Sequence, residues 1–280
     1  MERIKEAIEK AKSQSGVTRM PGQNHAEHPP VKLVKAPAQN VRAELDPEVS
    51  YSQTPVIKLD MAHLERHRIV AHQKLHPASW AFDFLRTQVL QKMDENGWRT
   101  LAITSPTMES GKTVVAINLA IGIAQQTNRT SLLVDFDLRR PRVASSLGLQ
   151  REVSLNQVLT GAAGVEEAMV NPGIPRFVVL PTQHAIPSSA EVLGSSRVAA
   201  LMDELREHYE DRIVVVDLPP VLAADDVLAL LPRVDCVLMV VGNGVSTKKE
   251  IEESMNRLAK FQLLGVVLNK DDAPVRNSYY

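Results

Sequence analysis

The feature that most constrains the fold is an apolar segment, residues 101–104, followed by a loop of small residues that ends in Gly111-Lys112-Thr113 at the start of a helical pattern. A strand, a loop and a helix N-terminus in this order form a phosphate cradle, because backbone N–H groups and the helix dipole both favour an anion there. In such a loop the lysine reaches phosphate oxygens and the threonine hydroxyl can hold Mg²⁺. Pro106 stands where the full pattern has its first glycine, so the loop alone is an incomplete match.

Two further apolar segments end in acidic residues. Residues 130–134 lead into Asp135 and Asp137, and residues 212–216 lead into Asp217. Ligands of open parallel sheets bind outside the carboxyl ends of the strands, so the loop and both acidic sites should share one crevice. The alternative is three unrelated strand ends whose aspartates cap helices. We favour the shared crevice, which predicts a nucleotide site.

Composition excludes several classes of protein. The chain has 280 residues, is 44% hydrophobic and carries a formal net charge of −1, so a sizeable core is expected and bulk attraction to nucleic acid is not. The single Cys236 excludes an internal disulfide framework and indicates a reducing, intracellular compartment. The N-terminus lacks the apolar core of a signal peptide, and no apolar run approaches the ~20 residues that span a bilayer. A soluble, cytoplasmic protein is expected.

The chain divides into three regions by composition. Residues 1–76 are expected to form a short amphipathic helix at 2–12 and, at 13–54, a flexible linker rich in Pro, Gly, Gln, Asn and Ser. This region also holds two histidine pairs at i,i+4 spacing, His63 with His67 and His72 with His76. Such spacing can bind a metal ion, but no cysteine joins the histidines, so we interpret them as a polar, solvated surface. Residues 77–273 should form the globular domain, and residues 274–280 form a polar tail.

Strand and helix patterns alternate through the globular domain. Because the strands are apolar throughout, they predict a mostly parallel sheet with helices on both faces, an α/β fold of the P-loop NTPase type. The expected strands are 98–104, 132–134, 177–180, 213–216, 236–241 and 263–268. The expected helices are 77–96, 114–125, 155–159, 197–208, 224–231 and 248–260.

Taken together, several segments resemble one family. The loop, the acidic segment 133–141, the segment 216–220 around Asp217, residues 264–270 and the two C-terminal tyrosines are similar to those of the bacterial tyrosine kinases. Those are P-loop enzymes that control exopolysaccharide synthesis and export. The short N-terminal helix with its linker is most similar to the exosortase-associated tyrosine autokinases. The resemblance covers residues 77–280 well and the first 76 residues loosely.

The resemblance implies ATP and Mg²⁺ as cofactors and a role for each matching residue. Phosphoryl transfer is mainly positioning plus neutralisation of phosphate charge, and a tyrosine hydroxyl also needs a carboxylate to take its proton. The implied catalytic residues are Lys112, Asp135 and Asp137, and the implied phosphate acceptors are Tyr279 and Tyr280. The implied nucleotide-binding residues are Ser110, Gly111, Lys112, Thr113, Val114 and Asn269, and the implied metal ligands are Thr113, Asp135 and Asp217.

The resemblance also implies partners. A membrane chain-length regulator, or polysaccharide co-polymerase, is the expected activator and would hold the chain at the inner membrane. A homo-oligomer and a cognate tyrosine phosphatase are further expected partners, and nucleic acid is not. The ring-forming Glu-x-x-Arg-x-x-Arg of the family corresponds here to Trp80, Asp83 and Arg86, so only the last arginine remains. Glu109 stands where the family loop commonly has glycine, which costs energy if φ is positive there.

Two other functions remain open at this point. A ParA-like positioning ATPase shares the fold, but it carries a second lysine five residues before the conserved one, where this chain has Thr107. A catalytically weak nucleotide-binding regulator or scaffold of polysaccharide export is supported by the altered loop. Retention of Lys112, Asp135, Asp137 and Asp217 favours the kinase.

Overall fold

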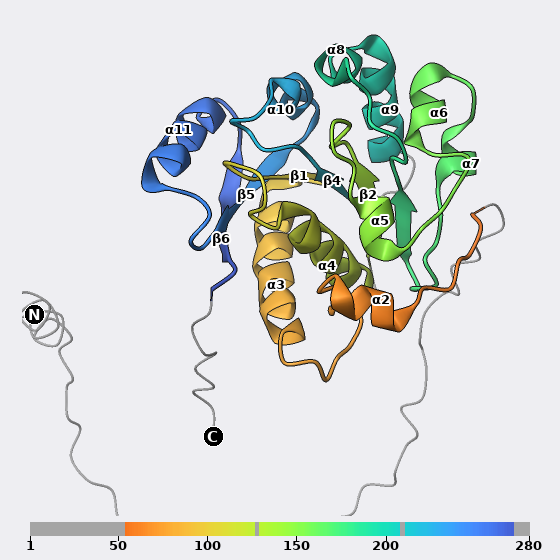
Figure 1. Cartoon of the computed structure of the whole chain (residues 1–280), viewed down its shortest axis with the longest axis horizontal. Helices are drawn as coiled ribbons and strands as arrows, with labels where there is room; N and C mark the ends of the chain where they lie inside the picture. The colour runs from red at the N-terminus through yellow and green to blue at the C-terminus, as the bar shows by residue number, and fades with distance from the viewer. Residues whose placement is uncertain (1–53, 127–128, 208–210, 272–280) are drawn as a thin grey trace, which may run out of the picture. The chain divides into compact units, whose positions relative to one another are not determined.

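The computed structural model describes residues 54–126, 129–207 and 211–271 (Figure 1). The helix expected over residues 2–12, almost all of the linker and the tail with Tyr279 and Tyr280 lie outside the described residues. No helix in the described ranges is long and apolar enough to cross a membrane.

The described residues form a parallel sheet in the order β3-β2-β4-β1-β5-β6. The strands are β1 Thr100–Thr104, β2 Thr130–Asp135, β3 Phe177–Leu180, β4 Arg212–Asp217, β5 Cys236–Gly242 and β6 Leu263–Asn269. β1 lies between β4 and β5, and the register places Ile103 and Asp135 each opposite Asp217. The expected α/β fold with a parallel sheet is confirmed, and the carboxyl ends of the three central strands meet at one edge.

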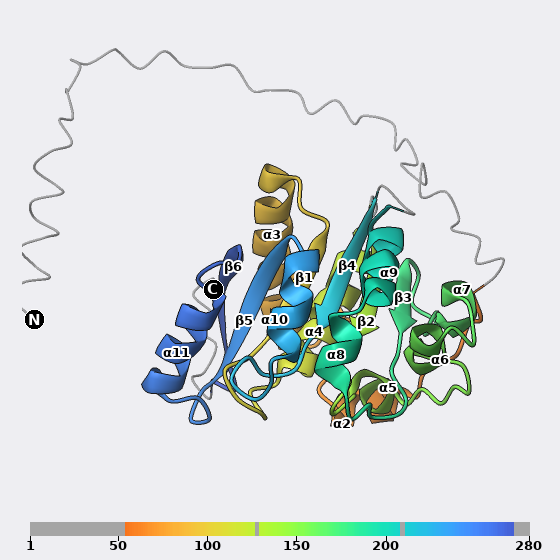
Figure 2. The ribbon, with the colours of Figure 1, turned by 90° about the horizontal axis from the view of Figure 1, so that it is seen from above.

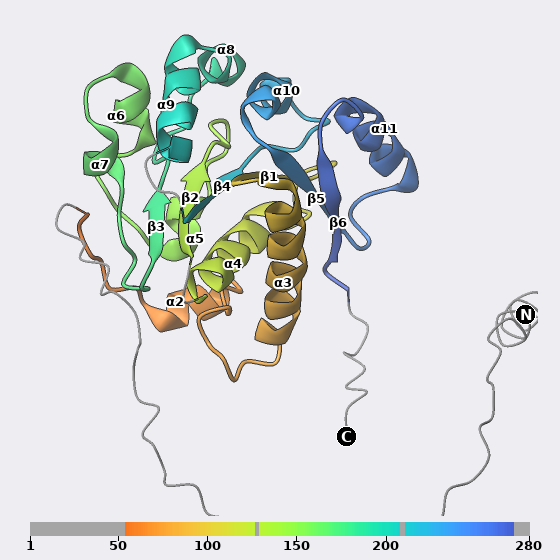
Figure 3. The same cartoon turned by 180° about the vertical axis from the view of Figure 1, so that it is seen from behind.

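Helices cover both faces of the sheet, as Figures 1 and 3 show from opposite sides and Figure 2 from above. One face packs against α2 Met61–Arg66, α3 Ser79–Asn96, α4 Lys112–Ala124 and α5 Val143–Leu147. The other face packs against α6 Leu155–Thr160, α7 Val165–Ala168, α8 Ser189–Leu193, α9 Ser196–Glu207, α10 Asp226–Leu230, the 3₁₀ turn η1 Leu231–Arg233 and α11 Lys248–Leu258. Successive strand side chains point to opposite faces, so Leu101 and Ile103 enter the first core and Ala102 the second.

A buried asparagine ties the segment before α3 to the helix that follows the phosphate loop. The Oδ1 atom of Asn118 accepts hydrogen bonds from the N–H groups of Val70 (2.8 Å) and Ala71 (2.9 Å). Its Nδ2 donates to the carbonyls of Arg68 (2.9 Å) and Val114 (2.8 Å). All four partners are backbone groups, so this one side chain holds residues 68–71 against α4.

The same upstream segment contributes apolar residues to the first core. Leu64 and Ile69 are fully buried, and Leu59 is 6% exposed. The boundary expected at residue 77 therefore lies inside the packed domain, which reaches back at least to residue 55 through bonds between Pro55, Ile57 and Asn171. His63 is also held, since its Nε2 lies 2.8 Å from the carbonyl of Ser145 on α5.

Candidate active site

The loop between β1 and α4 depends on one glycine at its end. Gly111 has φ 87°, and a Cβ built on it would lie 2.2 Å from Nδ2 of Asn269. That Nδ2 donates a hydrogen bond to the carbonyl of Ser110 at 2.9 Å. Any larger residue at position 111 would displace Asn269, so the glycine lets the end of β6 hold the loop in place.

Glu109 adopts the left-handed conformation with φ 64°. This is the position at which the resemblance suggested a glycine, and its positive φ confirms that the loop needs such a conformation there. The turn is closed by the hydroxyls of Ser105 and Ser110, which donate to the carbonyl of Thr107 at 2.7 and 3.1 Å. The loop therefore keeps its shape at a cost in backbone strain.

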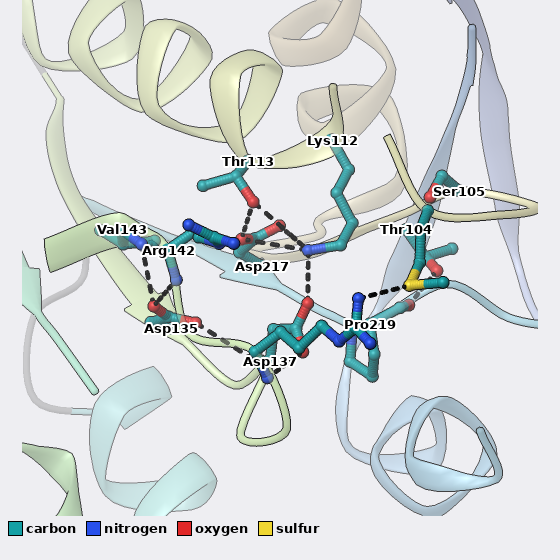
Figure 4. A network of polar contacts seen from close by, with 12 residues as sticks. Thr104, Ser105, Lys112, Thr113, Asp135, Asp137, Arg142, Val143, Asp217 and Pro219 are labelled. Carbon is teal, nitrogen blue, oxygen red and sulfur yellow. Dashed lines mark hydrogen bonds and ion pairs between the residues drawn. The ribbon is translucent and has the colours of Figure 1, made fainter. Parts of the chain in front are cut away.

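Four of the predicted residues meet at the start of α4 (Figure 4). The Lys112 Nζ lies 2.7 Å from Oδ2 of Asp137 and 3.4 Å from Oδ1 of Asp217. The Thr113 hydroxyl donates to Oδ2 of Asp217 at 2.6 Å. The loop and the ends of β2 and β4 thus converge on one crevice, as the strand-end argument predicted.

Asp135 has different partners from Asp137, although only one residue separates them. Its Oδ2 accepts hydrogen bonds from the N–H groups of Arg142 (3.1 Å) and Val143 (3.0 Å), at the start of α5. Its Oδ1 accepts from the N–H of Asp137 at 3.2 Å. The helix-capping role that could have belonged to Asp137 therefore falls to Asp135, and Asp137 is left to pair with Lys112.

The electrostatics of the crevice set three carboxylates against one ammonium. Burial lowers the pKa of Lys112, but the charges of Asp217, Asp137 and Asp135 outweigh it, so the net pKa is raised. Burial, together with the charge of Asp217, raises the pKa of Asp135 well above 3.8. Burial also raises the pKa of Asp217, against the lowering effect of Lys112. A cation bound among these three carboxyl groups would therefore stabilise their charged forms.

A cavity of about 640 Å³ opens beside this cluster. It is the right size for a small-molecule site. Its lining includes Lys112, Thr113, Val114 and Asp137. The remaining wall residues include Met108, Glu109, Arg139, Arg140, Arg142, Ser146, Pro219, Pro220, Ala223 and Ala224.

Comparison with known proteins identifies the family. Residues 99–267 match the family model described as the AAA domain, which covers more than half of the chain. The chain belongs to the AAA domain family. This match contains β1, the phosphate loop and every acidic residue of the crevice.

Within the AAA domain family, the similar proteins include tyrosine-protein kinases. The EpsB protein of Ralstonia nicotianae is 34% identical over 190 residues, which are 67% of this chain and 25% of EpsB. The tyrosine-protein kinase Etk of Escherichia coli K12 is 33% identical over 187 residues, 66% of this chain and 25% of Etk. The solved kinase domain of E. coli Etk has a TM-score of 0.68 and 28% identity, covering 81% of this chain and 93% of that domain. The resemblance to bacterial tyrosine kinases is confirmed, and the chain spans about a quarter of the length of EpsB and Etk.

The donor atoms of this AAA domain fit a hard cation on one side of the crevice. Thr113 and Asp217 present oxygen atoms, the ligands that Mg²⁺ prefers, and Mg²⁺ bound with a nucleotide needs few protein ligands. The described residues hold no group of three or more His, Cys, Asp or Glu side chains arranged for a metal ion. Asp135 accepts three backbone N–H groups, which leaves its carboxylate little capacity for a metal.

Ser110 and Asn269, both predicted to bind nucleotide, form hydrogen bonds that hold the phosphate loop. The Ser110 hydroxyl donates to the carbonyl of Thr107, and the Ser110 carbonyl accepts from Nδ2 of Asn269. An ion pair that the sequence analysis missed joins Arg139, just after Asp137, to Asp226 on α10 at 2.9 Å. The two residues lie 87 positions apart, and no local pattern connects them.

Proposed function

We propose that this chain is an ATP-dependent protein-tyrosine autokinase that transfers the γ-phosphate of ATP to Tyr279 and Tyr280. The observation that carries the proposal is the 2.7 Å pair of Lys112 with Asp137, beside the Thr113–Asp217 hydrogen bond, at the mouth of the phosphate loop. The similarity to tyrosine-protein kinases supports the same reaction.

The chemistry divides among the residues of the crevice. The phenolic oxygen of tyrosine attacks the γ-phosphorus, the bond to the β–γ bridging oxygen breaks, and ADP leaves. Asp137 accepts the phenolic proton, which a hydroxyl with a pKa near 10 does not release unaided at neutral pH. Lys112 neutralises phosphate charge in a nearly dry setting, where it acts strongly. Mg²⁺, held by Thr113 and Asp217, would supply further charge neutralisation on the phosphates.

One residue of the sequence favours a kinase over a ParA-like positioning ATPase. Thr107 occupies the place of the second lysine of those proteins, and a threonine side chain cannot supply that second positive charge. A weakly active nucleotide-binding regulator is the second candidate. The observation in its favour is Glu109, a carboxylate on a strained residue that lines the same cavity.

The proposal also covers where the enzyme acts and which proteins it works with. By its resemblance to the exosortase-associated autokinases, the chain would act in the cytoplasm at the inner membrane, recruited by a co-polymerase, and regulate exopolysaccharide synthesis or export. A cognate phosphatase would reverse the modification. Arg86 bonds to Asp83 within α3 at 2.6 Å, so the arginine left from the ring motif has a partner of its own. A homo-oligomer would therefore need other contacts, such as the exposed, stacked Trp80 and Phe84.

One experiment tests the proposed function. The purified chain is incubated with Mg·ATP, and phosphotyrosine is mapped by mass spectrometry in the wild type and in a Tyr279→Phe, Tyr280→Phe double variant. We expect phosphate on residues 279 and 280 in the wild type and none on residue 279 or 280 in the variant. ATP hydrolysis without any phosphotyrosine would favour the ATPase, and nucleotide binding without turnover would favour the regulator.

A further inference from the structure

The loop that follows Asp137 is anchored at three buried carboxylates. The N–H of Arg140 donates to Oδ1 of Asp137 at 3.1 Å, and the N–H of Arg142 donates to Oδ2 of Asp135 at 3.1 Å. Between them, the Arg139 guanidinium bonds to both carboxylate oxygens of Asp226, at 2.9 to 3.1 Å. These anchors hold residues 139–142 in one conformation beside the catalytic cluster.

Two of the three arginines on this loop have no carboxylate partner within the described ranges. The side chains of Arg140 and Arg142 are exposed and line the cavity. Arg140 donates to the Met108 sulfur at 3.0 Å, a neutral and weak acceptor. Two positive charges without a carboxylate partner in the described ranges thus line the cavity, while Arg139 pairs with Asp226. We call Arg140 and Arg142 the arginine rim.

Part of the cavity lining is apolar. It is built from the β4–α10 connection, with Pro219, Pro220, Ala223 and Ala224 facing the same space. The Thr104 hydroxyl donates to the carbonyl of Pro219 at 2.7 Å, which fixes this wall to the end of β1 (Figure 4). Proline and alanine side chains offer a surface on which an aromatic ring can pack. Asp137 lines the same cavity.

We propose that the arginine rim selects acceptor segments that carry negative charge directly beside the tyrosine. The inference rests on the proposed function and names the substrate class of the same site. A tyrosine ring packs on the Pro219–Pro220 wall with its hydroxyl toward Asp137, and the neighbouring acidic side chain pairs with Arg140 or Arg142. Guanidinium groups bind carboxylate and phosphate through charge-assisted, bidentate hydrogen bonds, which gives the rim its specificity.

The rim has a consequence for adjacent tyrosines. A phosphotyrosine carries about −1.5 to −2 charge at neutral pH. After one residue of the Tyr279-Tyr280 pair accepts phosphate, the pair presents the anion that the arginine rim binds. The second phosphorylation should therefore be faster than the first, although both tyrosines lie in the same tail.

Synthetic peptides test this inference. Four peptides share one acceptor tyrosine and differ only in the residue beside it, which is Glu, Gln, Lys or phosphotyrosine. We expect the wild-type chain with Mg·ATP to give a kcat/KM about tenfold higher for the Glu peptide than for the Lys peptide at low salt, and higher still for the phosphotyrosine peptide. In Arg142→Gln the difference should shrink to about twofold, and in Arg142→Glu the Lys peptide should become the better substrate.

Arg66→Gln is the matched control, because it removes an exposed arginine on α2 that does not line the cavity. Its peptide preference should equal that of the wild type. Equal kcat/KM for all four peptides in the wild type would overturn the inference and leave the kinase proposal standing. A loss of Mg·ADP affinity in Arg142→Gln with an unchanged peptide preference would also overturn it, because the arginine would then serve the nucleotide. No phosphotyrosine on any peptide or on the chain itself would overturn both proposals.

Discussion

Two groups of residues at the cavity differ in burial and in charge balance, and we call them the buried wall and the exposed wall. On one wall Lys112 and Thr113 are each 9% exposed, and Asp217 is fully buried beside them. On the other, Arg140 and Arg142 are exposed, without a carboxylate partner in the described part of the chain. The first wall is a closed network of opposite charges and the second is an open pair of like charges. This difference agrees with our two proposals, in which the buried wall carries out the reaction and the exposed wall selects what reacts.

Replacing the buried lysine should have the largest effect. In Lys112→Met we expect phosphotransfer to fall by at least ~10³-fold, because the phosphate charge loses its fixed neutralising group. Stability should also fall by about 3–5 kcal/mol, since Asp137 and Asp217 stay buried and lose the one cationic partner that the described residues give them. Phosphotyrosine yield and urea unfolding measure the two effects.

Lys112→Arg is the control for this variant. It keeps the charge, so it should recover most of the stability and little of the activity, because the larger guanidinium displaces the phosphate. Unfolding of Lys112→Met at the wild-type urea midpoint would show that the buried wall is not held by charge.

Asp137→Asn removes the acceptor of the tyrosine proton and keeps the oxygen that accepts the N–H of Arg140. We expect phosphorylation of the tail at least ~10²-fold slower, with Mg·ADP binding retained. The melting temperature should stay equal or rise, because one of three buried carboxylates is neutralised. A slow and destabilised variant would instead indicate that Asp137 is mainly structural.

The raised pKa of Asp135 should make the stability of the protein depend on pH. Burial and the charge of Asp217 hold its folded-state pKa above the unfolded value of 3.8, so the folded protein binds this proton more tightly. The stability gained by protonation is therefore complete below 3.8 and is lost as the pH rises through the folded-state pKa. Melting temperatures measured in EDTA, from pH 3.8 upward through the folded-state pKa, should change less in Asp135→Asn than in the wild type. Parallel profiles would show that Asp135 has no raised pKa.

Glu109→Gly should have the smallest effect. A glycine at φ 64° relieves the strain of the left-handed conformation but adds freedom to the unfolded chain, so we expect a gain of about 0.5–1 kcal/mol. Loss of the carboxylate should also strengthen Mg·ATP binding a few-fold. Glu109→Gln separates the two causes, because it removes the charge and keeps the strain. Weaker nucleotide binding in both variants would show that Glu109 assists the site.

The strands and long helices could be predicted because their patterns extend over several residues. The strand expected at 177–180 coincides with β3, and the helix expected at 197–208 is within one residue of α9 at both ends. The short helices α5, α7 and α8 were not expected, because four or five residues do not establish a helical period. The packing of residues 55–76 also escaped prediction, because it depends on Asn118 about 50 residues downstream.

The residues of the buried wall could be predicted from the sequence, and those of the exposed wall could not. Strand-end aspartates and the loop lysine could be grouped because parallel strands end at one edge. Whether Asp135 faces a metal ion or a helix N-terminus depends on the path of residues 138–142, which the sequence pattern does not determine. The arginine rim was overlooked for a related reason, since exposed arginines are common and only the cavity shows that these two line the same space as Lys112 and Asp137.

The division of roles between the walls is tested most directly by measuring kcat/KM for the Glu and Lys peptides in Asp137→Asn and in Arg142→Gln. We predict that Asp137→Asn lowers both values by the same factor, ~10² or more, and keeps their ratio. We predict that Arg142→Gln lowers the value for the Glu peptide and shrinks the ratio. A changed ratio in Asp137→Asn, or an equal loss for both peptides in Arg142→Gln, would contradict the account.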